Sequence, residues 1–173
     1  LIVGLASLAL MPRIQTNDTL IWSFVAAAVF LGLWLTFLLS RGRAERDTYS
    51  FEIALRPQHY IQACVQFSVY AYWGYHWELI PGSGLRPVYD HALLMVGQII
   101  FAYAFGILLS WSRNEKYILG FGPIPIIFSV NLFLWFRDDW FYMQFLMIAL
   151  GFMGKEYIRW SREGRSMHIF NPS

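Results

Sequence analysis

Two histidines, and the aromatic rings around one of them, are the residues in this sequence best suited to contact a cofactor. His76 lies within VYAYWGYHWELIP, from Val69 to Pro81, which carries five tyrosine and tryptophan rings. Imidazole nitrogens bind metal centres, and aromatic faces stack on flat ring systems. His91 follows Asp90 at the start of another apolar stretch. We therefore take His76 and His91 as candidate cofactor-binding residues, in contact with a tetrapyrrole or quinone.

The same residues also fit a simpler interpretation, an interfacial belt. Tyrosine and tryptophan gather at the headgroup level of membrane proteins, where amphipathic rings meet both water and hydrocarbon. His76 would then be a solvated or hydrogen-bonded side chain. His91 would lie near the N-terminus of a helix at the same interface. The sequence leaves both interpretations open.

A second set of polar residues lies within apolar stretches, where no water is at hand. These residues are Gln62, Gln66, Gln98, Asn131 and Gln144. Each needs a hydrogen-bond partner, which in a membrane bundle usually lies on a neighbouring helix. No Asp, Glu, Lys or Arg lies near the middle of an apolar stretch. Since pumps and transporters need ionisable groups at that depth, a small-molecule transporter is disfavoured.

Motifs for soluble-type catalysis are absent from the sequence. It contains no CxxC, HExxH or GxGxxG, and no defensible Ser-His-Asp arrangement. The single Cys64 excludes an internal disulfide. We therefore predict no catalytic residues, no metal site and no enzymatic activity of the chain's own.

Composition indicates a membrane protein. Hydrophobic residues make up 57% of the chain and charged residues only 14%, whereas soluble domains carry about 25% charged residues. The formal net charge of +2 is too small, and the basic residues too scattered, for a nucleic-acid partner. Lipids and other membrane subunits are the partners that this surface would accept.

The fold class predicted from these patterns is all-α, a polytopic transmembrane helical bundle forming a single domain. A span needs about 20 mostly apolar residues. Five stretches meet that requirement and residues 1–11 form a partial sixth; the full spans are 20–40, 61–80, 88–111, 118–136 and 140–157. Two glycines and two prolines between Gly120 and Phe128 should loosen the start of the fourth full span.

Orientation follows from the positive charges in the loops. One alternating set of connections holds ten Lys and Arg residues and the other holds three, Arg13, Arg86 and Arg137. Basic loops stay on the cytoplasmic side. We therefore predict a multi-pass membrane protein whose basic loops and tail, residues 158–173, face the cytoplasm.

The closing stretch GKEYIRWSREGRSMHIFNPS, from Gly154 to Ser173, carries a family resemblance. It is similar to a signature of the D subunit of Rnf electron-transport complexes and the B subunit of the sodium-pumping NADH:quinone oxidoreductase. The HIFNPS form resembles most the shorter UnbU-type relatives. The matching residues are Lys155, Gly164, Arg165, His168, Phe170, Asn171, Pro172 and Ser173. Similar runs occur at RPQHYIQA (Arg56 to Ala63), at Gln98 and at SVNLFLWFR (Ser129 to Arg137).

The resemblance implies a subunit of a multi-subunit electron-transport complex in a bacterial cytoplasmic (inner) membrane, and a chain equivalent to the N-terminal half of a longer fold. It also implies that Asn171 and Pro172 open a further helix, which suits the preferences of an N-cap and a first helical position. Larger family members attach flavin through a threonine of a Ser-Gly-Ala-Thr motif, which this chain lacks. We therefore expect a structural subunit without covalent flavin.

Alternatives remain at the level of function. Non-covalent flavin, quinone or tetrapyrrole contact stays open. An accessory subunit that contacts pigments, quinone or lipid beside a photosynthetic reaction centre would use the aromatic rings and His76 or His91.

Overall fold

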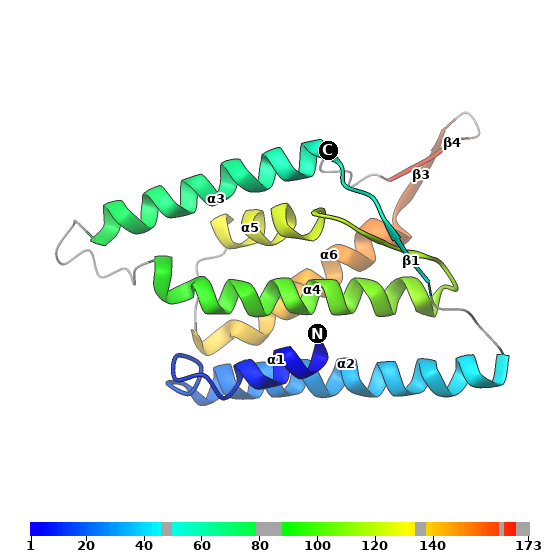
Figure 1. Ribbon diagram of the computed structural model, residues 1–173, viewed down its shortest axis with the longest axis horizontal. Helices are drawn as coiled ribbons and strands as arrows, with labels where there is room; N and C mark the ends of the chain where they lie inside the picture. Colours follow the sequence, from blue (N-terminus) through cyan, green and yellow to red (C-terminus); the bar gives the residue numbers. More distant parts are fainter. Residues whose placement is uncertain (46–49, 79–87, 134–137, 163–164, 169–173) are drawn as a thin grey trace.

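The computed structural model describes residues 1–45, 50–78, 88–133, 138–162 and 165–168. Within these ranges the chain is mostly helical, as predicted (Figure 1). The α-helices are α1 (Ile2–Leu8), α2 (Asp18–Glu45), α3 (Pro57–Glu78), α4 (Ala92–Ser112), α5 (Pro123–Phe133) and α6 (Phe141–Tyr157). Two short 3-10 helices, η1 (Val88–His91) and η2 (Asp138–Trp140), precede α4 and α6.

Two of these helices are long and apolar enough to cross a membrane. They cover Asp18–Gly42 and Tyr89–Ser112. Helix α3 has the length, but glutamines and tyrosines dilute its apolar character, and α5 and α6 span only 11 and 17 residues. Length and composition therefore support two of the five predicted full spans within the described residues. The partial span predicted over residues 1–11 contains the seven-residue α1.

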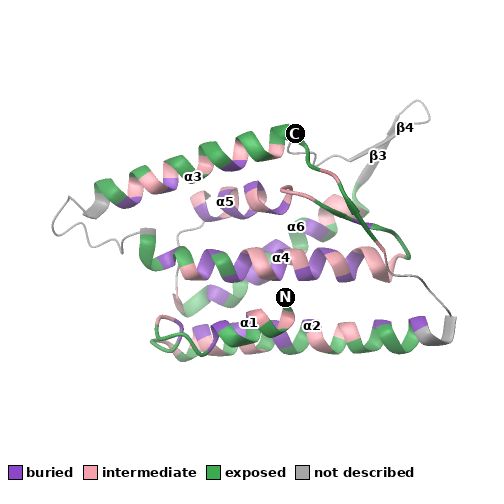
Figure 2. Cartoon of the chain, viewed as in Figure 1, coloured by how far each residue is buried: buried purple, intermediate pink, exposed green. Residues whose placement is uncertain are grey.

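Helix α4 is the centre of the bundle. It packs against α1, α2, α5 and α6, and many of its residues are buried (Figure 2). Phe24 of α2 lies against Gly97 of α4, where a Cβ atom would come within 2.3 Å of the Phe24 ring. The same ring stacks on Phe141 and meets the edge of Phe145, both on α6. The absence of a side chain at Gly97 thus lets α2 and α6 close on α4 through one aromatic cluster.

Helices α2 and α3 expose large apolar side chains along their outer faces (Figure 2). In the apolar stretch that could cross a membrane, only 33% of α2 is buried inside the protein, against 61% of α4. Trp22 and Leu33 of α2 and Val65 and Phe67 of α3 are each more than half exposed. Water solvates such surfaces poorly, so these faces suit hydrocarbon or another apolar partner.

The long helices α2 and α4 run between two opposite ends of the bundle, which in Figure 1 lie at the left and the right. The left end, here called the acidic end, is held together by Arg13. Its guanidinium pairs with Asp138 at 3.1 Å and donates to the backbone carbonyl of Asp90 at 3.2 Å. Asn17 donates to Asp139 at 2.8 Å. These contacts join described residues that precede α2, α4 and α6, and the charge pattern assigned all of them to the same side of the membrane.

The right end, here called the basic end, carries Arg56, Arg113, Lys116 and Lys155. Helix α4 ends just before Asn114, whose φ of 56° is tolerated by asparagine better than by most residues. Arg113 then bonds Glu115 at 2.7 Å and Glu156 at 2.8 Å. The two loop sets predicted from charge thus occupy opposite ends, while the side of the membrane that each faces stays a prediction.

Four short strands depart from the all-α prediction. Strands β1 (Phe51–Ile53) and β2 (Tyr117–Leu119) pair in parallel, with Phe51 opposite Tyr117. Strands β3 (Arg159–Arg162) and β4 (Arg165–His168) pair antiparallel within the basic tail. The predicted helical span over residues 118–136 is consequently wrong at its start, because residues 118 and 119 belong to β2.

A close contact between two backbone segments explains why α5 begins at Pro123 and not at residue 118. A Cβ atom at Gly120 would lie 2.5 Å from the carbonyl oxygen of Ala54, so only glycine allows β1 and β2 to approach. Helix α5 starts at Pro123, a residue whose fixed φ and missing N–H suit the first helical position.

Candidate functional site

The two candidate histidines lie on elements that contact each other, α3 and η1, but in different surroundings. His76, in the last turn of α3, is exposed, and its ring stacks on Tyr72 with centroids 5.9 Å apart and planes 8° apart. His91, the last residue of η1 and the N-cap of α4, is only 7% exposed. Tyr89 links η1 to α3. Its ring covers Gly74 of α3, and its hydroxyl donates to the backbone carbonyl of Ala71 at 3.0 Å.

The rings around His76 divide between the interior and the surface. Tyr70 is buried and donates to the carbonyl of Phe128 on α5 at 2.8 Å, so it fixes α3 to α5. Tyr72 and Tyr75 are more than 60% exposed. The outward rings suit either an interfacial belt or a stacking surface, and cofactor contact at His76 and His91 stays a prediction. Among the described residues, no group of three His, Cys, Asp or Glu side chains could hold a metal ion.

Three amide side chains form a buried chain of hydrogen bonds across three helices. Asn131 of α5 donates to Gln98 of α4 at 2.5 Å, and Gln98 donates to Gln144 of α6. Their exposed fractions are 2%, 0% and 5%, respectively. We call these three residues the amide chain. Its bonds confirm the prediction that polar residues in the apolar stretches pair across helix contacts.

The remaining predicted polar residues lie on α3. Gln66 donates to the hydroxyl of Ser129 on α5 at 2.8 Å, which ties a fourth helix to the same assembly. Gln62 is half-buried one turn earlier on α3. These two glutamines are four residues apart and share one face of α3, and that face therefore turns toward protein.

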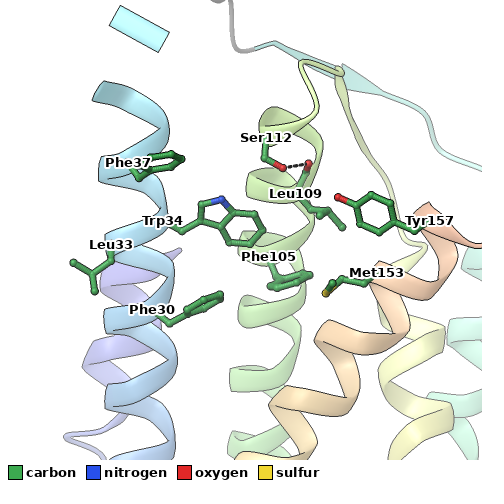
Figure 3. A pocket seen from close by; sticks show the side chains of 9 residues that line it. All are labelled: Phe30, Leu33, Trp34, Phe37, Phe105, Leu109, Ser112, Met153 and Tyr157. Carbon is green, nitrogen blue, oxygen red and sulfur yellow. Dashed lines mark hydrogen bonds between the residues drawn. The ribbon is translucent and has the colours of Figure 1, made fainter. Parts of the chain in front are cut away.

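An aromatic groove opens between α2, α4 and α6 near the basic end (Figure 3). Its volume is about 450 Å³. The rings and the thioether that shape it belong to Phe30, Trp34, Phe37, Phe105, Met153 and Tyr157. Trp34 meets the edge of Phe105 with centroids 5.3 Å apart. The hydroxyl of Ser112 donates back to the carbonyl of Leu109 at 2.7 Å, so the wall stays apolar.

A second cavity, here called the basic pocket, lies at the basic end between the β1–β2 pair, α3, α4 and α6. Its volume is about 360 Å³. The ionisable side chains that line it are Arg56, His59, Glu115, Lys116, Lys155 and Glu156. Burial lowers the pKa of the His59 imidazole, and the positive charges of Lys155 and Arg56 lower it further. The pocket therefore disfavours an additional positive charge.

The residues of the closing motif are only partly described. Lys155 lies in the last turn of α6 and lines the basic pocket. Arg165 and His168 lie in β4, opposite Arg162 and Arg159 of β3. The other members of the motif lie outside the described residues; they are Gly164, Phe170, Asn171, Pro172 and Ser173. The helix start predicted at Asn171 thus stays a prediction.

Sequence reasoning missed both cavities. Phe30, Trp34 and Phe37 recur at helical spacing, which places them on one face of α2 but does not show that a groove lies there. Arg56 and His59 belong to the run RPQHYIQA that carries part of the family resemblance, but the sequence predicted no role for either residue. Comparison with protein-family models, with curated proteins and with solved structures finds no match to the chain.

Proposed function

We propose that this chain is a structural membrane subunit of a multi-subunit electron-transport complex, related to the Rnf D-type scaffold. The amide chain is the observation that carries the proposal. The buried amides of Gln98, Asn131 and Gln144 bond one another, so this polar interior serves helix packing. A scaffold needs such an interior, whereas a transporter needs ionisable groups at depth.

The outer surface supports the same proposal. Large apolar side chains cover α2 and α3, and two helices have the length and composition of membrane spans. In the proposed arrangement five spans cross a bacterial inner membrane and the basic end faces the cytoplasm. The exposed apolar faces would then contact lipid and neighbouring subunits.

Native membranes provide the test. A tagged chain, extracted in mild detergent, is expected to migrate on native electrophoresis in an assembly far larger than its own 20.2 kDa. The spectrum of that assembly should show redox cofactors. After denaturation, the chain itself should show no fluorescent flavin band under ultraviolet light. A free chain without redox partners would contradict the proposal, and a fluorescent band at its mass would contradict the structural role.

A second candidate function is favoured by the aromatic groove. Its rings, from α2, α4 and α6, offer flat apolar faces to a quinone or a pigment, as an accessory subunit beside a photosynthetic reaction centre would need. The test is photo-crosslinking with a light-activated quinone. Trp34→Ala should lower labelling, whereas Trp22→Ala, at a 69% exposed position on the same helix outside the groove, should not. Equal labelling of both variants would contradict this function.

A further inference from the structure

The basic pocket combines a charged rim with an apolar floor. Arg56, Lys116 and Lys155 reach it from three separate parts of the chain, the start of α3, the α4–β2 connection and the end of α6. Leu109 and Phe152 are buried side chains that also line it. A ligand that satisfies both surfaces must be an anion with an apolar part. The volume of about 360 Å³ falls within the range of small-molecule sites, about 300–1,000 Å³.

The two carboxylates at this pocket do not cancel its positive charge. Arg113, which does not line the cavity, bonds Glu115 at 2.7 Å and Glu156 at 2.8 Å. The pocket and Arg113 together hold four Lys and Arg side chains against two carboxylates. Burial lowers the pKa of His59, and the positive charges of Lys155 and Arg56 lower it further, as expected beside these cations.

The N-terminus of α5 adds to this positive charge. Pro123, its first residue, lines the pocket together with Gly120 and Gly122. The N-terminal end of a helix carries a partial positive charge. Pro123 and Pro125 have no N–H, so the start of α5 contributes a positive electrostatic potential more than hydrogen bonds. The side-chain cations must therefore supply the hydrogen-bond donors for an anion.

We infer that the basic pocket binds the phosphate of an amphiphilic anion, with Arg56, Lys116 and Lys155 around the phosphate and Leu109 and Phe152 beneath the apolar part. An anionic phospholipid of the facing leaflet has this chemistry, and so does a soluble phosphate ester. The inference rests on the membrane placement in the proposed function but not on membership of an electron-transport complex.

Isothermal titration of the purified full chain in a neutral detergent tests the inference. The probes are dihexanoyl phosphatidylglycerol, dihexanoyl phosphatidylcholine and hexyl phosphate, a soluble phosphate ester with an apolar chain. We expect the anionic lipid to bind more tightly than the zwitterionic one, and more weakly as salt increases. Each basic side chain near a lipid surface contributes about 1 kcal/mol, roughly a fivefold change in Kd. Arg56→Gln/Lys116→Gln should therefore weaken binding about 25-fold.

The control variant is Arg41→Gln, an exposed arginine on α2 near the basic end that does not line the pocket. Its Kd should match that of the unchanged protein. Arg56 and Lys116 are both exposed, so their replacement leaves the core intact, and circular dichroism checks the fold. Should the double variant fail this check, Lys116→Gln alone should give the fivefold effect.

The outcomes separate two sources of phosphate. Tighter binding of phosphatidylglycerol with the expected variant pattern supports a lipid ligand. Binding of hexyl phosphate at equal strength, with the same variant pattern, supports a soluble phosphate ester. Equal affinity for both lipids, or equal weakening by Arg41→Gln, overturns the inference. These measurements use the isolated chain, so they fail or succeed independently of the test in native membranes.

Discussion

Gln98 is the residue at which three helices of the bundle meet. Its side chain has no exposed surface, and it accepts from Asn131 while it donates to Gln144. A hydrophobic residue at this position would fill the space but leave an amide on each side without its partner. The position therefore demands a side chain that is both donor and acceptor, which glutamine supplies at the required length.

Gln98→Leu is expected to destabilise the bundle. The change keeps most of the volume but leaves Asn131 and Gln144 without Gln98, and each buried polar group left unpaired costs about 1–3 kcal/mol. Thermal unfolding in detergent, followed by circular dichroism, should show a lower midpoint. Gln58→Leu, at an exposed position on α3, is the control and should change stability by less than about 0.5 kcal/mol. Equal midpoints for the two variants would contradict a structural amide chain.

His59 makes stability depend on pH in a stated direction. Its pKa in the folded chain is lowered by burial, Lys155 and Arg56, so the unfolded chain takes up the proton first as pH falls. Stability should therefore be highest above the ordinary histidine pKa of about 6.5 and should decrease below it. His59→Gln should remove part of the fall in unfolding midpoint between pH 7.5 and 5.5. An unchanged fall in this variant would show that other groups are responsible.

At the scale of elements, the β1–β2 pair closes the basic end. Ala54 donates its backbone N–H to the carbonyl of Leu119 at 3.0 Å, next to the close approach of Gly120. This pair joins the segment before α3 to the segment before α5. It thereby fixes the relative position of the two helices whose ends line the basic pocket.

Gly120→Ala should loosen this pairing. The added methyl would lie 2.5 Å from the Ala54 carbonyl oxygen, so the backbone must shift at a cost of roughly 1–3 kcal/mol. Hydrogen exchange measured by mass spectrometry should then be faster over residues 51–54 and 117–119. Gly122→Ala is the matched control, because its methyl would meet His59 at an ordinary 3.5 Å. Equal exchange in both variants would show that the strand pair does not depend on Gly120.

The sequence predicted helices better than it predicted their ends. Long apolar runs mark α2 and α4, and isolated glutamines correctly predicted hydrogen bonds between helices. Which amide bonds which could not be predicted, because Gln98, Asn131 and Gln144 are far apart in the chain. The parallel pairing of Phe51 with Tyr117 likewise rests on backbone hydrogen bonds, which leave no periodic pattern in either segment. Cavities lined from several separate elements, as both of these are, carry no local signal at all.

At the scale of the whole molecule, charge separates the two ends of the bundle. Arg13 is paired with Asp138 at one end, while Arg56, Lys116 and Lys155 gather at the other. From the positive-inside rule we predict that the richer end faces the cytoplasm. If five helices span the membrane, every loop must obey this assignment.

Single cysteines, introduced after Cys64→Ser, test that assignment with a membrane-impermeant thiol reagent. Arg41→Cys and Gln58→Cys, at exposed positions near the basic end, should react only from the cytoplasmic side. Gln15→Cys and Asp139→Cys, exposed at the acidic end, should react only from outside. Labelling of positions at both ends from one side would contradict the five-span arrangement.

The amide chain has a consequence for the electrical behaviour of the bundle. Its members are uncharged at every physiological pH, so they add no gating charge for a transmembrane voltage to move. Hydrogen bonds between neutral amides also bind helices together without offering an acid or base for proton hopping. Beside redox partners that build an ion gradient, helices joined in this way would offer protons no path through the amide chain.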